Sequence, residues 1–277
     1  MPFKNYAAVT DVGRQRNNNE DTFLAKPLAG LWLVADGMGG HAAGEIASGI
    51  VAKTIEAEIN NGHPLSKSVQ MAHYAVLDAA ASGVGGQGMG STVVALNSQK
   101  TEYEIAWVGD SRAYLWNTEQ HDNAFELLQL TSDHSYVQML YESGAINADE
   151  LHDHPEKNII TQCLGSLDLD DVRVDTMRGR WQPHQWILLC SDGLNDTITD
   201  EEIAATLREA GANIQQACSD LVQRALDGGG RDNITLIVIS RPNKWVSLAV
   251  DVHKKVMSRI RRATPGLDLH TPRKSET

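Results

Sequence analysis

The stretch LWLVADGMGG, residues 31–40, joins five apolar residues to an acid and a glycine-rich turn. A short, continuous apolar run that ends at turn residues is typical of a buried strand. Asp36 is the first polar residue after this run, so we expect its carboxylate at the rim of a sheet. The stretch therefore predicts both a core strand and a polar site at the end of that strand.

Four further segments repeat this arrangement of acids beside an apolar run. Asp110 follows EIAWVG, and Asp192 follows WILLCS. Asp232 stands just before ITLIVI, and Glu20 and Asp21 stand just before TFLA. We expect these strand ends to converge, which would gather the acids in one cleft.

Carboxylates that converge repel one another unless cations lie between them. A set of oxygen ligands without a histidine or cysteine cluster suits Mg²⁺ or Mn²⁺ better than zinc. Two such ions about 3.5–4 Å apart can polarise a phosphoryl oxygen and activate a water molecule. The alternative for each acid taken singly is an ordinary turn residue, because Asp-Gly is a common turn dipeptide.

Arg16 lies four residues before Glu20. An arginine among so many acids can bind a phosphate through two parallel hydrogen bonds. The alternative is a stabilising ion pair with Glu20 or Asp21, and the sequence does not separate the two.

The other apolar segments predict a sheet-rich fold with two pairs of helices. Tight turns beside several of the short strands favour antiparallel pairing, and sheets are expected inside with helices outside. The predicted strands are Tyr6–Thr10, Thr22–Ala25, Leu31–Ala35, Thr92–Asn97, Glu104–Val108, Ala113–Trp116, Phe125–Leu130, Trp186–Cys190 and Ile234–Ser240. The predicted helices are Ala42–Asn60, Ser66–Ala81, Thr199–Gly211 and Asn213–Leu226.

Two local features refine this prediction. Thr199 and Glu202 form a capping box at the start of the third helix. The polar segment Thr131–Gly165, with a short helix around Tyr136–Ser143, is expected to rise from the sheet as an insertion outside the core.

Composition and charge exclude several classes of protein. The chain has 277 residues, with 24 Lys and Arg against 36 Asp and Glu and a formal net charge of −12. A nucleic-acid partner is not expected, because its binder must replace phosphate counterions with its own cations. Three cysteines without CxxC spacing exclude a disulfide framework and a cysteine zinc site. Without a leader-like segment or an apolar run of about 18 residues, we expect a cytoplasmic protein.

The C-terminal segment differs in charge from the rest of the chain. Residues 243–277 hold eight Lys and Arg against three Asp and Glu. We place a boundary near Arg241-Pro242, with a domain at 1–240 and a basic tail at 241–277. Apolar residues from Trp245 to Ile260 recur at helical spacing, so the tail is expected to be partly helical. Such a helix would contact a partner or an anionic membrane surface, or it would pack on the acidic domain itself.

Two glycine motifs raise a nucleotide-binding alternative. GMGGHA (37–42) follows a strand and opens a helix, as a dinucleotide fingerprint does. The fingerprint also needs an acid at the end of a second strand, whereas Glu56 and Glu58 lie in a helical stretch. GVGGQG (83–88) follows a helix and precedes a strand, which is the wrong order. A nicotinamide-dependent oxidoreductase is therefore a distant alternative, and no G-x-S-x-G elbow supports a serine hydrolase.

Seven motifs carry a resemblance to a known family. They occur in the order RNNNED (16–21), VADGMGGH (34–41), GST (90–92), GDSR (109–112), LTSDHS (130–135), CSDGL (190–194) and GRDN (230–233). Over roughly residues 3–240 the chain resembles the metal-dependent protein phosphatases, the type 2C serine/threonine phosphatases, in their compact bacterial form. The resemblance implies a single α+β domain in which two packed antiparallel β-sheets are flanked by helices, an α-β-β-α sandwich.

The resemblance also implies metal ligands at Glu20, Asp21, Asp36, Gly37, Asp110, Asp192 and Asp232. Asp36 would bridge two Mn²⁺ or Mg²⁺ ions, with Gly37 lending its backbone carbonyl. Asp192 and Asp232 would complete the first ion, while Glu20 and Asp21 would serve the second ion or its waters. Asp110 with Asp192 would hold a weaker third ion. The flap, about residues 143–157, would influence the choice of substrate.

The activity implied by the resemblance is that of a serine/threonine phosphoprotein phosphatase opposing a kinase in bacterial signalling. Arg16 and the metals would bind the substrate phosphate, and a metal-bridging hydroxide would attack phosphorus in one step. The catalytic residues implied are Arg16, Asp36 and Asp192. Animal members often have a histidine directly after the Asp-Gly, proposed to protonate the leaving alkoxide, whereas this chain has Met38. His41 is not expected to replace it, so we expect a metal-bound water as the proton donor.

The expected partners are proteins phosphorylated on serine or threonine, including a cognate kinase or its substrates, and the chain itself is expected to be a monomer. The alternative from another class is a non-catalytic regulator on the same fold that binds phosphoproteins. Such a regulator should have lost a bridging acid, and Asp36, Asp192 and Asp232 are all present.

Overall fold

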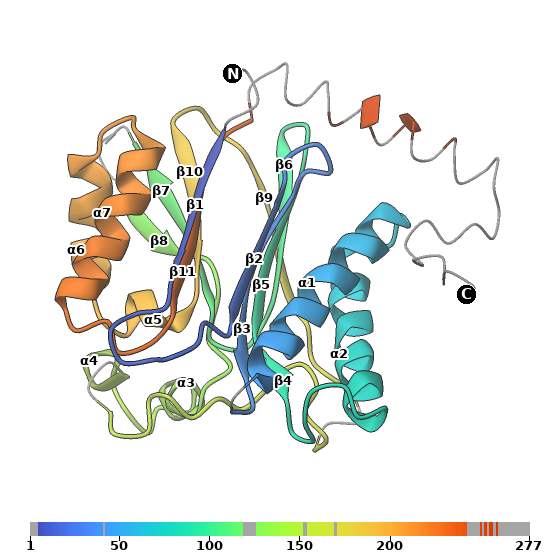
Figure 1. Cartoon of the computed structure of the whole chain (residues 1–277). Helices are drawn as coiled ribbons and strands as arrows, with labels where there is room; N and C mark the ends of the chain where they lie inside the picture. Colours follow the sequence, from blue (N-terminus) through green and yellow to red (C-terminus); the bar gives the residue numbers. More distant parts are fainter. Residues whose placement is uncertain are drawn as a thin grey trace.

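Two antiparallel sheets stack face to face in the computed structural model of the chain (Figure 1). The structure describes residues 5–40, 42–118, 126–151, 154–168 and 171–242, together with Val250, Val252, His253, Lys255, Val256 and Arg259 of the tail. Within these residues the two sheets and their covering helices form four layers, so the predicted α-β-β-α sandwich is confirmed.

The first sheet has the strand order β1-β11-β10-β7-β8. These strands are Tyr6–Asp11, Ile234–Ser240, Gln185–Cys190, Arg112–Asn117 and Leu127–Gln129. The second sheet has the order β2-β3-β5-β6-β9, and the short strand β4 pairs with the end of β3. Its strands are Asp21–Lys26, Leu31–Met38, Val93–Gln99, Glu102–Val108 and Asp175–Arg180, with β4 at Gly90–Ser91.

Strand β3 explains why its sequence is apolar at every position. Trp32 and Val34 belong to the cluster between the two sheets. Leu31, Leu33 and Ala35 belong to the cluster under the helices that cover the second sheet. Because the strand is buried on both faces, no position along it can be polar until it reaches the rim at Asp36.

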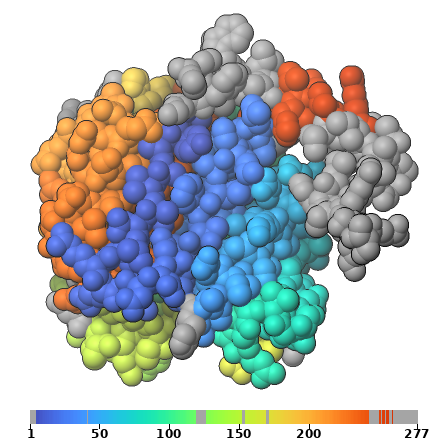
Figure 2. All heavy atoms as spheres, viewed as in Figure 1, coloured from blue at the N-terminus to red at the C-terminus, as the bar shows by residue number. Residues whose placement is uncertain are grey.

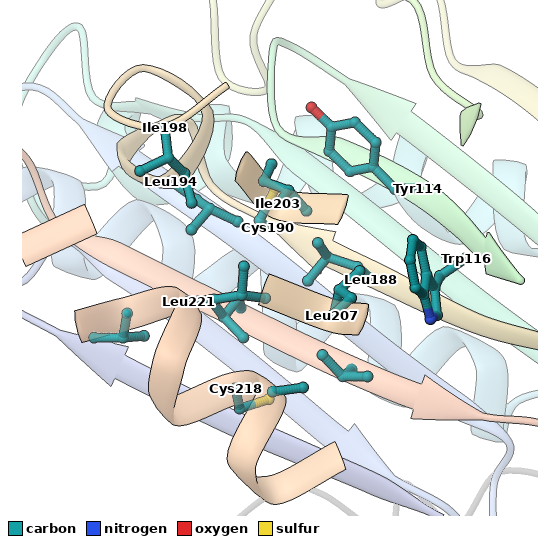
Figure 3. Packing of buried hydrophobic residues seen from close by; sticks show 14 of the residues in the cluster. Tyr114, Trp116, Leu188, Cys190, Leu194, Ile198, Ile203, Leu207, Cys218 and Leu221 are labelled. Carbon is teal, nitrogen blue, oxygen red and sulfur yellow. The ribbon is translucent and has the colours of Figure 1, made fainter. Parts of the chain in front are cut away.

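Two helix pairs cover the outer faces of the sheets (Figure 1). Helices α1 (Ala43–Asn60) and α2 (Leu65–Ala81) pack on the second sheet. Helices α6 (Asp200–Glu209) and α7 (Ile214–Asp227) pack on the first sheet, where Leu207 and Leu221 meet the strand residue Leu188 (Figure 3). All four helices lie within a residue or two of the predicted ranges.

Side chains fix the starts of the helices on the first sheet. The predicted capping box is present: the backbone N–H of Thr199 donates to the Glu202 carboxylate at 2.9 Å, and the Glu202 N–H donates to Thr199 Oγ1 at 3.3 Å. The Asn213 side chain caps α7 by accepting from the N–H of Gln216. A further short helix, α5 (Asp192–Asn195), follows β10 directly and was not predicted.

The segment predicted as an insertion runs along one end of the sandwich (Figure 1). It contains α3 (Tyr136–Glu142) and α4 (Ala148–Leu151). The expectation that all of Thr131–Gly165 lies outside the core was wrong at its C-terminal end. Leu164 is fully buried in the cluster under α1 and α2, because the segment returns there to bond with Ser91.

Two strand predictions needed correction. Strand β9 was missed because its sequence, DTMRGR, contains no apolar run; it is an edge strand with alternate exposed residues. The predicted strand Phe125–Leu130 is shorter, covering Leu127–Gln129, and Phe125 lies outside the described residues.

The tail is described at only a few positions. Those positions are helical, and Val250 is buried with its side chain beside Gly30. The boundary at Arg241-Pro242 stays a prediction. Among the described helices, none has the length and apolar character needed to cross a bilayer.

Candidate metal centre

The predicted acids gather at one end of the sandwich because the strands that carry them end there. Asp21 opens β2 and lies directly opposite Asp36 of β3 in the strand register. Asp192 opens α5 straight after β10, Asp110 lies in the turn between β6 and β7, and Asp232 lies just before β11. Like charges directly opposite each other destabilise a strand pair, so this arrangement needs something to compensate it.

Asp36 lies at the middle of the group. Its carboxyl group is within hydrogen-bonding range of Asp192 and of Asp21. Burial, and then the charges of Asp21, Asp192 and Asp110, hold the pKa of Asp36 well above its usual range. Burial and the neighbouring charge of Asp110 do the same to the pKa of Asp192. Each acid therefore opposes the ionisation of the next.

The two flanking acids are perturbed less. Burial raises the pKa of Asp21 to about 6, although hydrogen bonds from Thr235 and Ser191 counteract part of that effect. The Ser191 hydroxyl donates to Asp21 Oδ2 at 2.8 Å. Burial, followed by the charge of Asp133, raises the pKa of Asp110 to about 7.

Unpaired oxygens test whether divalent cations fit this group. Glu20 Oε1, Asp21 Oδ1 and Asp192 Oδ1 are buried and have no hydrogen-bond partner in the described part of the chain. Buried carboxylate oxygens without donors are costly, and hard cations such as Mg²⁺ and Mn²⁺ satisfy them. Among the described residues, no three His, Cys, Asp or Glu side chains are already arranged around a cation position. The donor set nevertheless fits the predicted metals.

Arg16 lies at the edge of the group, on the loop between β1 and β2. Its Nη2 donates to Asp232 Oδ2 at 2.6 Å, and 52% of its side chain is exposed. This hydrogen bond raises the pKa of Arg16 further, so the group stays charged. The alternative prediction, an ion pair of Arg16 with Glu20 or Asp21, was wrong about the partner, because Arg16 pairs with Asp232.

Asn233 organises this loop, a role that was not predicted. Its Nδ2 donates to the backbone carbonyls of Val12 and Asn18, both at 2.9 Å, and its Oδ1 accepts from the Glu20 N–H at 2.8 Å. Figure 2 shows the β1–β2 segment at the surface between α7 and α1. The only signal in the sequence was the position of Asn233 directly after Asp232.

A close backbone approach explains the glycine after Asp36. A Cβ atom on Gly37 would lie 2.0 Å from the carbonyl oxygen of Gly44, near the start of α1. Met38, the next residue, pairs with Gly90 in β4, and its thioether has no proton to donate. His41 lies outside the described residues.

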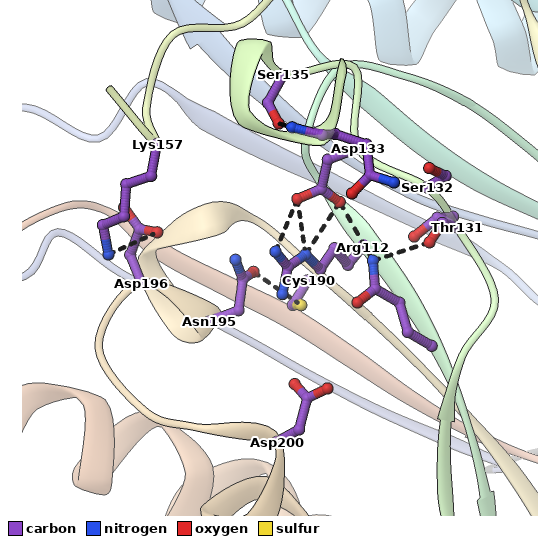
Figure 4. Close-up of polar contacts among 12 residues, drawn as sticks. Arg112, Thr131, Ser132, Asp133, Ser135, Lys157, Cys190, Asn195, Asp196 and Asp200 are labelled. Carbon is purple, nitrogen blue, oxygen red and sulfur yellow. Dashed lines mark hydrogen bonds and ion pairs between the residues drawn. The ribbon is translucent and has the colours of Figure 1, made fainter. Parts of the chain in front are cut away.

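A cleft of about 430 Å³ opens beside the acids. Asp110 and Asp192 belong to its lining, together with residues of the α3–α4 segment and of the start of α6. Figure 4 shows part of this cleft, with the Arg112–Asp133 and Lys157–Asp196 pairs on its sides. A substrate group could therefore reach the acids from solvent through this opening.

Together, the fold and the site define an α-β-β-α sandwich protein with a polyacidic cleft suited to divalent cations. A sequence profile described as protein phosphatase 2C matches residues 13–227. The chain belongs to the protein phosphatase 2C family.

Curated relatives support this assignment. The serine/threonine protein phosphatase PstP of Mycobacterium tuberculosis is 35% identical over 240 residues, which cover 84% of this chain and 44% of the relative. The serine/threonine phosphatase stp of Listeria welshimeri is 34% identical over 247 residues, covering 84% of this chain and 94% of the relative. The chain thus spans less than half of the mycobacterial protein but nearly all of the Listeria protein.

Solved structures are similar as well. The crystal structure of the M. tuberculosis phosphatase PstP/Ppp superposes with a TM-score of 0.76 at 33% identity, covering 86% of this chain and 98% of that one. A structure of the PstP catalytic domain in complex with two manganese ions gives a TM-score of 0.70 at 33% identity, covering 85% and 96%.

Proposed function

We propose that this chain is a serine/threonine phosphoprotein phosphatase that depends on Mn²⁺ or Mg²⁺ and opposes a kinase in bacterial signalling. The observation that carries the proposal is the group of buried, mutually repelling carboxyl groups at Asp21, Asp36, Asp110 and Asp192. A cluster of this kind is held together by cations. Similarity to a relative solved with two manganese ions supports the same conclusion.

We assign the metal ligands as the resemblance implies. Asp36 would contact both ions, with Gly37 lending its backbone carbonyl. Asp192 and Asp232 would complete the first ion, and Glu20 and Asp21 would serve the second ion or its waters. Asp110 with Asp192 would hold a weaker third. Bound Mn²⁺ or Mg²⁺ supplies an activated water and positive charge facing the phosphoryl oxygens.

The residues of the chain would bind and orient the phosphate. Arg16 uses one nitrogen on Asp232 and keeps half of its side chain exposed, so the rest of its guanidinium can donate to phosphate oxygens. Ser191 holds Asp21, and Asn233 holds the loop of Arg16, which limits the motion of both during the reaction. Because Met38 cannot donate a proton, we expect water to protonate the leaving alkoxide.

We propose the following organisation for the protein. The catalytic domain would span 1–240 with its flap at about 143–157, and the chain would act as a cytoplasmic monomer on phosphorylated proteins. Its physiological substrates would include a kinase or the targets of that kinase.

Phosphate release from a phosphothreonine peptide tests the activity. We expect turnover with Mn²⁺, none with EDTA, and a loss of more than about a hundredfold in Asp192→Asn. Calorimetric titration with Mn²⁺ provides a readout that does not depend on activity and should show weaker binding in the variant. Folded protein that binds the peptide but never releases phosphate would favour the non-catalytic regulator instead.

A further inference from the structure

The cleft beside the metal-binding acids carries more negative charge than the proposed metal ions would neutralise. Apart from Asp110 and Asp192, its lining includes four acids that are not assigned as metal ligands: Asp133, Asp196, Asp200 and Glu201. Among the described lining residues, the cations are Arg112 and Lys157. The described lining therefore keeps excess negative charge even if bound metals neutralise Asp110 and Asp192.

The positive charges in the cleft are unequally engaged. Arg112 donates to both oxygens of Asp133, at 2.7–3.0 Å, so that pair neutralises itself (Figure 4). The Lys157 ammonium lies 3.6 Å from Asp196 Oδ1, which is longer than the usual charge-assisted hydrogen bond of about 2.7–2.9 Å. Lys157 belongs to the flap and Asp196 follows α5, so an ammonium group already sits between the two walls of the cleft.

Two acids at the start of α6 remain available. Asp200 accepts a hydrogen bond from the Tyr114 hydroxyl at 3.0 Å through Oδ1, and Figure 4 shows its carboxyl group pointing toward Asn195 and Arg112. Glu201 is exposed and has no ion pair or side-chain hydrogen bond within the described residues. Carboxylates in the first turn of a helix interact favourably with the helix dipole. Asp200 and Glu201 occupy such positions, and in addition they line the cleft.

Asn195 gives a second, independent indication of a ligand. It is only 6% exposed, and its Oδ1 accepts a weak bond from the Cys190 thiol at 3.8 Å. Its amide nitrogen has no hydrogen-bond partner among the described residues, and Figure 4 shows it turned away from Cys190. Since the otherwise buried Asn195 lines the cleft, its amide nitrogen is placed to donate to an oxygen of whatever fills the space.

We propose that the cleft between the flap and α5–α6 binds a lysine or arginine side chain of the substrate, next to the phosphorylated residue. Asp196, Asp200 and Glu201 would bind the cationic head, and Asn195 would donate to a backbone carbonyl of the substrate. Apolar Val137 and Ile198 in the same lining would contact the aliphatic stem of the side chain. This subsite rests on the proposed phosphatase function, because it gives that function a preference for basic phosphoproteins.

Matched phosphothreonine peptides test the subsite. The peptides are identical except for Arg, Ala or Glu at one position, which is moved through the residues near the phosphothreonine. With Mn²⁺, we expect one position at which kcat/KM for the Arg peptide exceeds that for the Glu peptide by about fivefold or more. The preference should shrink with added salt.

Charge variants assign that preference to the cleft. Glu201→Gln should reduce the ratio of kcat/KM for the Arg peptide to kcat/KM for the Glu peptide at least twofold. The double variant Asp200→Asn/Glu201→Gln should reduce this ratio at least threefold. In both variants, kcat/KM for p-nitrophenyl phosphate should stay within twofold of wild type. Asp78→Asn removes an exposed acid of α2, a helix that contributes no described residue to the cleft lining, and should leave the ratio unchanged. A ratio near one in the wild type, or an unchanged ratio in both cleft variants, would overturn the subsite.

Failure of the phosphatase activity would give a different result. If neither p-nitrophenyl phosphate nor any peptide is hydrolysed with Mn²⁺, the proposed function fails. Fluorescence anisotropy with the same peptides then still decides the subsite: tighter binding of the Arg peptide, lost in Glu201→Gln, supports it. Equal binding of the Arg, Ala and Glu peptides contradicts it.

Discussion

Asp36 is held at a cost in stability, because three other carboxyl groups surround it. Its pKa is raised by burial and by Asp21, Asp192 and Asp110. Residues kept for a metal site in this way commonly destabilise the metal-free protein. The same feature that prepares the site for cations should therefore weaken the fold when cations are removed.

The Asp36→Asn variant tests this trade-off. In EDTA, we expect its free energy of unfolding to rise by about 1–2 kcal/mol, because an amide can donate to Asp21 and Asp192 instead of repelling them. Urea unfolding measures the change. Calorimetry should show Mn²⁺ binding lost, and phosphate release should fall more than about a hundredfold. Asp78→Asn is the control for loss of one acid, and a less stable metal-free Asp36→Asn protein would contradict the explanation.

The raised pKa values also predict how stability depends on pH. The pKa of Asp110 is about 7 in the folded chain, against about 3.9 in an unfolded chain. An acid whose folded pKa is raised stabilises the fold below the unfolded value, and that contribution is lost as pH rises through the folded value. For Asp110 the loss should extend from about pH 4 to pH 7, and for Asp21 from about pH 4 to pH 6.

Other groups titrate in the same range, so the measurement must isolate Asp110. Burial lowers the pKa of His73 and His134, which weakens the fold as the pH falls. We therefore compare Asp110→Asn with wild type in EDTA at each pH. The stability of the variant relative to wild type should increase by about 2 kcal/mol between pH 5 and pH 8, or about 5 °C in Tm. A difference that does not change with pH would contradict the raised pKa.

At the scale of elements, the loop between β1 and β2 is held in place by one side chain, that of Asn233, which lies directly before β11. Asn233 satisfies the N–H of Glu20 and the carbonyls of Val12 and Asn18. The loop carries Arg16, so its position sets the position of the guanidinium. Unpaired backbone groups are costly when water cannot replace the lost partner.

Asn233→Ala should therefore affect both stability and activity. We expect a loss of about 2–3 kcal/mol in urea unfolding, because three hydrogen bonds disappear. We also expect a decrease of about tenfold in kcat/KM for a phosphopeptide, mostly through KM, because Arg16 loses its fixed position. Gln223→Ala removes an exposed amide of α7 and should change neither by a measurable amount. Full activity in folded Asn233→Ala would show that the loop is held in another way.

At the scale of the whole molecule, the tail meets the body at Val250. This residue is 4% exposed, and its side chain lies 3.6 Å from the position of a Cβ on Gly30. Val252, two residues later, is 54% exposed. This contact favours packing of at least part of the tail on the domain, while the exposed valines leave contact with a partner or an anionic surface open.

The two valines form a matched pair for testing that contact. Val250→Ala should lower the free energy of unfolding by about 1 kcal/mol, since it removes buried methyl groups. Val252→Ala should change it by less than about 0.5 kcal/mol. Both variants should keep phosphatase activity within twofold of wild type, since the contact is at the far end of the second sheet from Asp36. Equal effects of the two substitutions would argue against a docked tail.

Several features were predictable because their signals are local. The strand around Trp32 and Val34 could be predicted because burial on both faces makes the run apolar, and the cap at Thr199 follows from residues three apart. The acids at the rims could be found for the same reason, since each follows or precedes its own strand. Their grouping was a hypothesis that the structure supports, and their individual metal roles stay proposals.

Other features depend on contacts between distant parts of the chain. Strand β9 has no apolar run and is specified by pairing with β6, whose residues lie 68–78 positions earlier in the sequence. Arg16 pairs with Asp232, which lies 216 residues later in the sequence. Asn233 accepts a hydrogen bond from Glu20, which lies 213 residues earlier. The acidic cleft likewise forms only where the α3–α4 segment lies next to α5 and α6. Sequence patterns report the local environment of a residue, whereas these partners are chosen by the packing of the two sheets, which brings distant strand ends together.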